Sequence, residues 1–199
     1  MNALLQDLEG TKYDGKIKIV GFPCNQFKHQ EPARNTTELL NGLRYVRPGE
    51  GYIPAFDLMN KSDVNGPKEN PVYTYLKSTC RIPSAAKFRP RVSFWEPIRP
   101  SDIVWNFEKF VIDAAGRPLF RFLSPVEPLD VKEIMMQVSD NGKDDGKTVN
   151  GEQRYCRPSP EHGEKVQTSV LIKTELSWHR RLQLFRRERD LLFTAEYEE

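Results

Sequence analysis

Hydrophobic positions along the first two thirds of the chain alternate between helical and strand-like spacing. Residues 2–9 place four apolar side chains at helical spacing, and a glycine ends the segment. Residues 16–22, KIKIVGF, form a β-branched run bounded by glycine and proline, which predicts a strand. The same criteria predict further helices at 36–43, 72–78 and 128–138, and strands at 56–63, 104–112 and 118–122.

The order of these elements indicates the fold class. A helix end, strand, helix, strand, helix, hairpin and helix follow one another, which predicts an α/β fold with a mixed sheet flanked by helices. Asn35 immediately precedes the helix at 36–43, and Glu38 follows three residues later, as in a capping box. Because the pattern opens on the end of a helix, we expect that the first elements of the fold are missing from this sequence.

The chain changes character at Ser139. Residues 139–153 are polar and rich in glycine, which is typical of a linker. Residues 1–138 are therefore predicted to form the folded domain, and 139–199 a poorly ordered extension. Within that extension, HRRLQLFRRERDLLF at 179–193 fits either a basic amphipathic helix or a solvated tail, and the second interpretation is favoured.

Composition narrows the classes of binding partner that this protein is expected to have. Of 199 residues, 38% are hydrophobic and 29% charged, and the net charge is +2, too small to favour nucleic acid or an anionic membrane as the main partner. No apolar run approaches the roughly 20 residues that span a bilayer. Three cysteines, Cys24, Cys80 and Cys156, form no CxxC pair. An odd, sparse set predicts buried or free thiols rather than a disulfide framework.

The segment GFPCNQFKHQEP, residues 21–32, contains a thiol, several amides and several ionisable side chains within a short stretch. Cys24 follows the end of a predicted strand, where open α/β folds bind ligands, and Lys28 and His29 could lower its pKa. The alternative is a small, partly buried side chain in a turn. Gln30 and the pair Trp105–Asn106 are uncharged donors suited to stabilising a developing anion, although such a pair more often serves packing.

Five segments occur in order over about residues 1–138: GFPCNQFKHQEP, LRYVRPGEGYIPAFDLMNKSDVNG, YLKSTC, FWEPI and WNFEKFVIDAAGRPLFRF. Together they resemble the glutathione peroxidase family, and most of all its longer plasma-type branch. The resemblance implies a thioredoxin-like fold and reduction of hydroperoxides by a thiol, usually glutathione as co-substrate, with no cofactor or metal. It also implies that Gln30, Trp105 and Asn106 surround a peroxidatic selenocysteine or cysteine, and that Arg47 binds glutathione carboxylates.

Three departures from the family pattern matter. The family places its peroxidatic residue at the start of the helix that ends at 2–9, so that residue is expected ahead of Met1, and Cys24 is not expected to replace it. The family usually has glycine where Lys28 stands, and a lysine there could distort the turn that presents Gln30. Residues 139–199 match nothing in the family pattern.

The predicted function is therefore a glutathione peroxidase-type oxidoreductase in the response to oxidative stress. The chain alone is expected to have little or no activity, because donors without a nucleophile cannot do covalent chemistry. The alternative is an inactive fragment, or a dominant-negative partner of a full-length peroxidase. The resemblance allows a homo-oligomer and an extracellular or cytoplasmic location, with any signal peptide in the missing N-terminal part.

Overall fold

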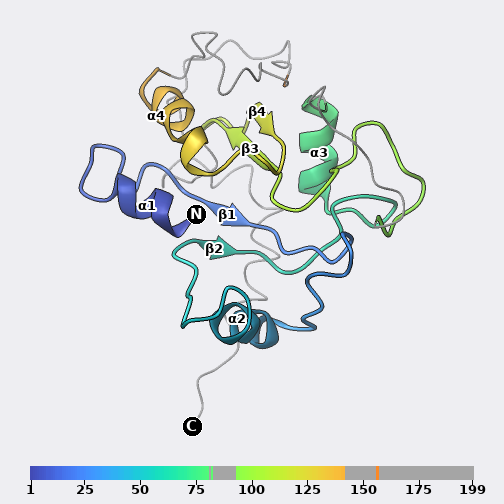
Figure 1. The fold of residues 1–199 in the computed structure, drawn as a ribbon. Coiled ribbons are helices and arrows are strands. Elements are labelled where there is room, and N and C mark those ends of the chain that lie inside the picture. Colours follow the sequence, from blue (N-terminus) through green and yellow to red (C-terminus); the bar gives the residue numbers. More distant parts are fainter. Residues whose placement is uncertain (81, 83–92, 142–155, 157–199) are drawn as a thin grey trace.

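The computed structural model describes residues 1–80, 82, 93–141 and 156, and every structural statement below applies to these residues. The predicted extension lies outside them except for 139–141 and Cys156. The elements run in the order shown in Figure 1: α1 (Asn2–Leu8), β1 (Val20–Gly21), α2 (Thr36–Tyr45), β2 (Asp57–Leu58), α3 (Pro71–Thr79), β3 (Lys109–Ile112), β4 (Pro118–Phe122), the 3₁₀ helix η2 (Leu129–Val131) and α4 (Lys132–Asn141).

The strands form two separate sheets of two strands each within the described residues. β1 and β2 are parallel, with Val20 opposite Asp57, and β3 and β4 form the predicted antiparallel hairpin. The α/β class is thus confirmed. β1 is shorter than the predicted 16–22, because the N–H groups of Lys16 and Ile17 instead donate to the carbonyl of Tyr13 in a turn.

α2 begins at the predicted Thr36 and α3 one residue before the predicted start, whereas α4 begins at Lys132, after the 3₁₀ helix η2 and four residues later than predicted. The Asn35 side chain accepts from the backbone N–H of Glu38 at 2.9 Å, and the Glu38 carboxylate accepts from the N–H of Arg34 at 2.7 Å. This reciprocal pairing satisfies N–H groups at the start of α2 that have no partner within the helix. Asn70 caps α3 through the N–H of Val72 at 3.0 Å. α4 extends through Asn141, three residues beyond the predicted 128–138.

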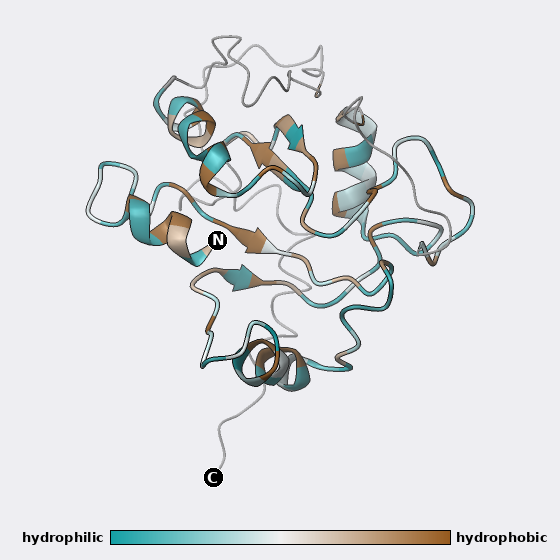
Figure 2. Cartoon of the chain, in the orientation of Figure 1, coloured by the Kyte–Doolittle hydropathy of each residue, from teal (hydrophilic) through white to brown (hydrophobic). Residues whose placement is uncertain are grey.

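The main hydrophobic core lies between α1, α4 and the β3–β4 hairpin. Leu4 and Leu8 of α1 pack with Phe120 and Phe122 of β4, and Val138 of α4 is 1% exposed. Figure 2 shows hydrophobic residues on β1 and along much of the β3–β4 hairpin, whereas β2 and many connecting loops are polar. Burial of this face, rather than helix propensity, holds the two short helices in place.

One disulfide contradicts the prediction of free thiols. Cys80, the C-cap of α3, is bonded to Cys156, and both side chains are buried. The sequence could not reveal this pair, because the two cysteines are 76 residues apart and share no spacing motif. Cys24 is the free cysteine.

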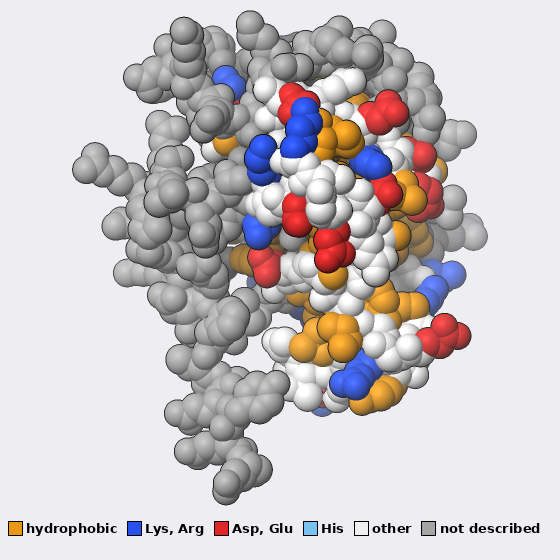
Figure 3. Space-filling model, turned by 90° about the vertical axis from the view of Figure 1, so that its left-hand side faces the viewer, with side chains coloured by type: hydrophobic (Ala, Val, Ile, Leu, Met, Phe, Trp, Pro, Cys, Tyr) orange, Lys and Arg blue, Asp and Glu red, His pale blue; other side chains and the backbone are white. Residues whose placement is uncertain are grey.

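Surface charge agrees with the small net charge. The face seen in Figure 3 carries lysine, arginine and acidic side chains intermingled, with no patch of a single sign. None of the described helices is long and apolar enough to cross a membrane.

Candidate functional site

Two loops far apart in the sequence meet through their amides. Gln30 lies after β1 and Asn106 lies just before β3. The Asn106 Nδ2 donates to the Gln30 Oε1 at 2.7 Å. Since this contact uses the Gln30 oxygen, the Gln30 amide N–H groups, which bond to no other described residue, remain available to a ligand. The arrangement presents an exposed hydrogen-bond donor suited to a developing anion.

Trp105 packs beside this pair. Its indole ring lies 5.9 Å from the ring of Phe27, centroid to centroid, in a tilted arrangement. Phe27 also contacts Trp95 edge-on at 5.4 Å, and both rings belong to a second buried cluster with Val64 and Ile103, against which the partly buried Trp105 packs. Because such aromatic contacts fix ring orientation, Trp105 forms a rigid wall next to Asn106.

Two buried amides join the site loops, and the sequence analysis did not identify this role. The Gln26 Nε2 donates to the carbonyl of Asn65 at 2.8 Å, and the Gln26 Oε1 accepts from the N–H groups of Val64 and Asn65 at 2.9 and 3.0 Å. The fully buried Asn65 then bonds both backbone groups of Ile103, at 2.9 and 2.8 Å. A buried amide with every polar atom bonded specifies one geometry. The available signal was the Asn–Gly turn at 65–66, which also fits an ordinary surface turn.

Glu108 holds the loop that carries Trp105 and Asn106. Its carboxylate accepts from the backbone N–H of Val104 and from the Arg121 Nε, the latter at 2.9 Å. Burial raises the pKa of Glu108, although the Arg121 charge opposes that shift. Burying this carboxylate costs little free energy only while its hydrogen-bond donors, the Val104 N–H and Arg121, stay in place.

The turn before Gln30 adopts an unusual backbone conformation. Lys28 has φ 57° and His29 has φ 49°, both in the left-handed region that favours glycine. The lysine side chain is exposed, and the His29 ring stacks on Phe94 at 3.8 Å. The expected distortion therefore takes the form of backbone strain at Lys28, while Gln30 still reaches Asn106.

Cys24 does not have the predicted electrostatic environment. Burial raises the pKa of its thiol, so the expectation that Lys28 and His29 lower that pKa is wrong. The thiol donates to the Gln26 Oε1 at 3.6 Å and accepts from the Gln26 N–H at 3.4 Å. A protonated, half-buried thiol is a poor nucleophile.

Arg47 is the remaining predicted site residue. It follows α2, its side chain is exposed, and among the described residues no hydrogen bond or ion pair joins it to Gln30, Trp105 or Asn106. The described part of the chain also contains no group of three or more histidine, cysteine or acidic side chains arranged to hold a metal ion.

Comparison with known proteins gives a consistent result. The family model described as glutathione peroxidase matches residues 2–77. The rat epididymal secretory glutathione peroxidase is 48% identical over 136 residues, which cover 68% of this chain and 59% of the relative. Glutathione peroxidase 2 of Pongo pygmaeus is 43% identical over 133 residues, covering 62% and 69%. A Trypanosoma cruzi structure, "T. cruzi GPX1", aligns with 25% identity and a TM-score of 0.42, covering 68% of each chain.

The chain thus spans about 59% of the length of the rat relative, and a larger share of the shorter Pongo pygmaeus enzyme. The residues matched by the family model include the loop around Gln30, and the alignment with the rat relative covers 68% of the chain. On these grounds the chain belongs to the glutathione peroxidase family.

Proposed function

We propose that this chain carries the donor half of a peroxidase site that reduces hydroperoxides with a thiol. Gln30, Trp105 and Asn106 would surround a peroxidatic selenocysteine or cysteine that is not among residues 1–199. The observation that supports this most strongly is the Asn106–Gln30 hydrogen bond, because it occupies the oxygen of this exposed side chain and leaves its amide N–H groups for a ligand. Hydroperoxide and glutathione, or another thiol, are the proposed substrates.

The proposed reaction accounts for all atoms and electrons without a cofactor. The selenolate or thiolate attacks the outer peroxide oxygen, the O–O bond breaks, and the alcohol leaves with a proton. The resulting selenenic or sulfenic acid reacts with one glutathione to give water and a selenenyl sulfide or a mixed disulfide. A second glutathione releases the disulfide and restores the starting state. The donor side chains stabilise the anionic nucleophile and the charge on the departing alkoxide.

Site assembly is best tested in a chimaera. Residues 1–141 would replace the matching stretch of the rat relative, which supplies the polypeptide that this chain does not match. We expect hydroperoxide reduction with glutathione, and a loss in kcat/KM of about 100- to 1000-fold for Gln30→Ala and for Asn106→Ala. Gln6→Ala, an exposed amide on α1, serves as the control. Full activity in both site variants would refute the donor role.

The chain by itself should turn over little hydroperoxide. A rate comparable to that of a full-length enzyme, measured with glutathione or thioredoxin as the reductant, would contradict the proposal. Labelling with a sulfenic-acid probe after peroxide treatment tests whether Cys24 substitutes for the missing residue. We expect equal labelling of the wild type and Cys24→Ser.

We further propose an extracellular or cytoplasmic location for the complete protein. The name of the rat relative supports the first of these, because that protein is described as secretory. A homo-oligomer is also proposed, and sedimentation of the chimaera at several concentrations would test it.

A further inference from the structure

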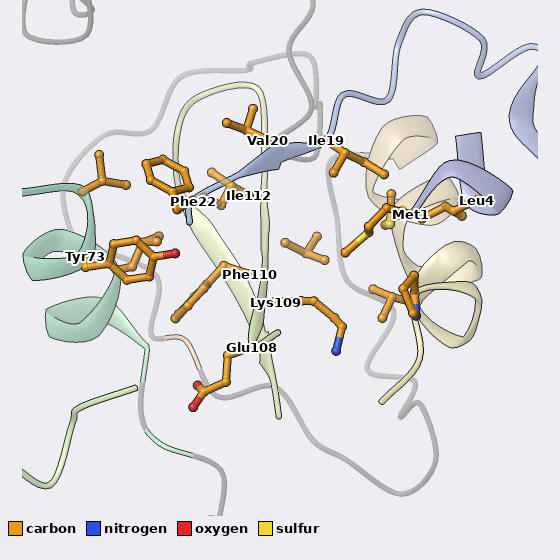
Figure 4. Close-up of a pocket in the computed structure, with 16 residues that line it drawn as sticks. Met1, Leu4, Ile19, Val20, Phe22, Tyr73, Glu108, Lys109, Phe110 and Ile112 are labelled. Atoms are coloured by element: carbon orange, nitrogen blue, oxygen red, sulfur yellow. The ribbon is translucent and has the colours of Figure 1, made fainter. Parts of the chain in front are cut away.

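The two charged side chains that line the cavity between β1 and β3 are already paired (Figure 4). The Glu108 carboxylate bonds to the Arg121 guanidinium at 2.9 Å. The Lys109 ammonium donates to the carbonyls of Leu123 and Ser124 at 3.4 and 3.2 Å. A charged ligand would have to displace these partners before it could bind there. The exposed loop that leads into α2 carries less committed chemistry.

The disulfide between Cys80 and Cys156 indicates the kind of compartment in which the chain folds. Both side chains are buried, so the bond forms part of the packed structure. Disulfides form and persist in oxidising compartments such as the secretory pathway, and they are rare in the cytosol, where thiols are kept reduced. The bond therefore favours the extracellular alternative of the proposed location over the cytoplasmic one.

Residues 35–37, Asn-Thr-Thr, form an acceptor motif for N-linked glycans. The motif consists of asparagine, any residue except proline, and then threonine or serine. All three residues are exposed, at the junction between the loop and the first turn of α2. Figure 1 shows α2 at the edge of the molecule, with β2 between it and the β3–β4 hairpin. A bulky, hydrated glycan attached here would project into solvent and displace no core side chain.

The hydrogen bonds of Asn35 leave its nitrogen available for modification. Its Oδ1 accepts from the backbone N–H of Glu38 at 2.9 Å and so caps α2. Among the described residues, its Nδ2 contacts the Glu38 Oε1 at 3.4 Å, which is long for a hydrogen bond. An amide nitrogen carries two hydrogens, so a bond to one sugar carbon removes one donor and leaves the oxygen unchanged. A glycan on Asn35 is thus compatible with the cap that begins α2.

We propose that Asn35 is an N-glycosylation site, an inference that rests on the extracellular location proposed above. The co-substrate is a lipid-linked oligosaccharide pyrophosphate. The bond between the anomeric carbon of the first sugar and the pyrophosphate oxygen breaks, and a bond from that carbon to the Asn35 Nδ2 forms. One amide proton is released, the lipid pyrophosphate leaves, and no group is oxidised or reduced.

The test expresses the full chain behind a cleavable secretory leader in cultured animal cells, so that its result does not depend on the proposed location. Every version carries Asn60→Gln, because Asn60–Lys61–Ser62 is a second acceptor motif. We expect most of the protein to migrate slowly on a denaturing gel and to lose the extra mass after peptide-N-glycosidase treatment. Secreted and cell-associated protein are both analysed, since the glycan is added before export. Protein without such sensitive mass in either fraction would overturn the proposal.

Two matched threonine variants localise the modification. Thr37→Ala destroys the motif but keeps both partners of the Asn35–Glu38 cap, and it should abolish the glycan completely. Thr36→Ala changes the neighbouring exposed residue but keeps the motif, and it should be glycosylated as fully as the parent protein. Equal glycosylation of the two variants would contradict Asn35 as the acceptor. The location is tested separately, by whether the complete protein from its natural transcript is recovered from the medium or from the cytosol.

Discussion

The left-handed backbone at Lys28 gives a sharp prediction: Lys28→Gly should stabilise the protein. At φ 57° an L-residue with a β-carbon is strained by about 1–2 kcal/mol, whereas glycine is not. The Lys28 side chain is exposed, and its removal breaks no hydrogen bond or ion pair of the described residues. Glycine also gives the unfolded chain more conformational freedom, which offsets about 0.5–1 kcal/mol of the relieved strain.

The net expected gain is about 0.5–1 kcal/mol in the free energy of unfolding. For a folded region of this size, the transition temperature should rise by about 1–4 °C. Thermal unfolding followed by circular dichroism measures the shift, and urea unfolding checks it independently. Because the Gln30–Asn106 contact already forms beside Lys28, the chimaera should keep its kcat/KM.

The matched control is Lys68→Gly. Lys68 is also an exposed lysine in a turn, but its φ is not positive. At Lys68 the same substitution relieves no backbone strain and only increases the conformational entropy of the unfolded chain. It should therefore lower the free energy of unfolding by about 0.5–1 kcal/mol. The reasoning fails if Lys28→Gly lowers the transition temperature as much as the control does, because backbone strain would then not dominate at Lys28.

Three further predictions concern the buried groups. Gln26→Ala removes three buried hydrogen bonds and should lower the free energy of unfolding, measured in urea, by about 2–4 kcal/mol. The exposed Gln6→Ala should lower it by less than about 0.5 kcal/mol, and a similar loss in both variants would contradict a stabilising role of the Gln26 hydrogen bonds. Reduction of the disulfide should cost about 2–4 kcal/mol, and Cys80→Ser should reproduce the loss and abolish the response to reductant. Cys24 should react with iodoacetamide more slowly at pH 7 than free cysteine does, because burial raises its pKa, and faster labelling would contradict that direction. Above its ordinary pKa of about 8.5, the unfolded thiol loses its proton first, so the Cys24 contribution to stability falls as pH rises; Cys24→Ser should flatten that part of the pH profile.

Local chemistry in the sequence determined the helices and the hairpin. Asn35 and Glu38 define the start of α2 through side-chain bonds that need only neighbouring residues. The Asp113–Gly116 turn likewise closes on itself, with the Asp113 carboxylate bonding the N–H groups of Ala115 and Arg117. Side-chain type also marked Gln30 and Asn106 as uncharged donors, although it gave no reason for them to meet.

The tertiary structure alone decided what joins those local pieces. The Gln26–Asn65–Ile103 network brings the donor loops together, and the Cys80–Cys156 bond ties α3 to a distant residue. Strand pairing was also decided at this level: the pattern predicted one mixed sheet, while the described residues form two separate sheets of two strands each. Contacts between residues far apart in the sequence depend on which backbone edges and side chains the folded chain brings together. Hydrophobic spacing records only which face of each element is buried, so it leaves those partners undetermined.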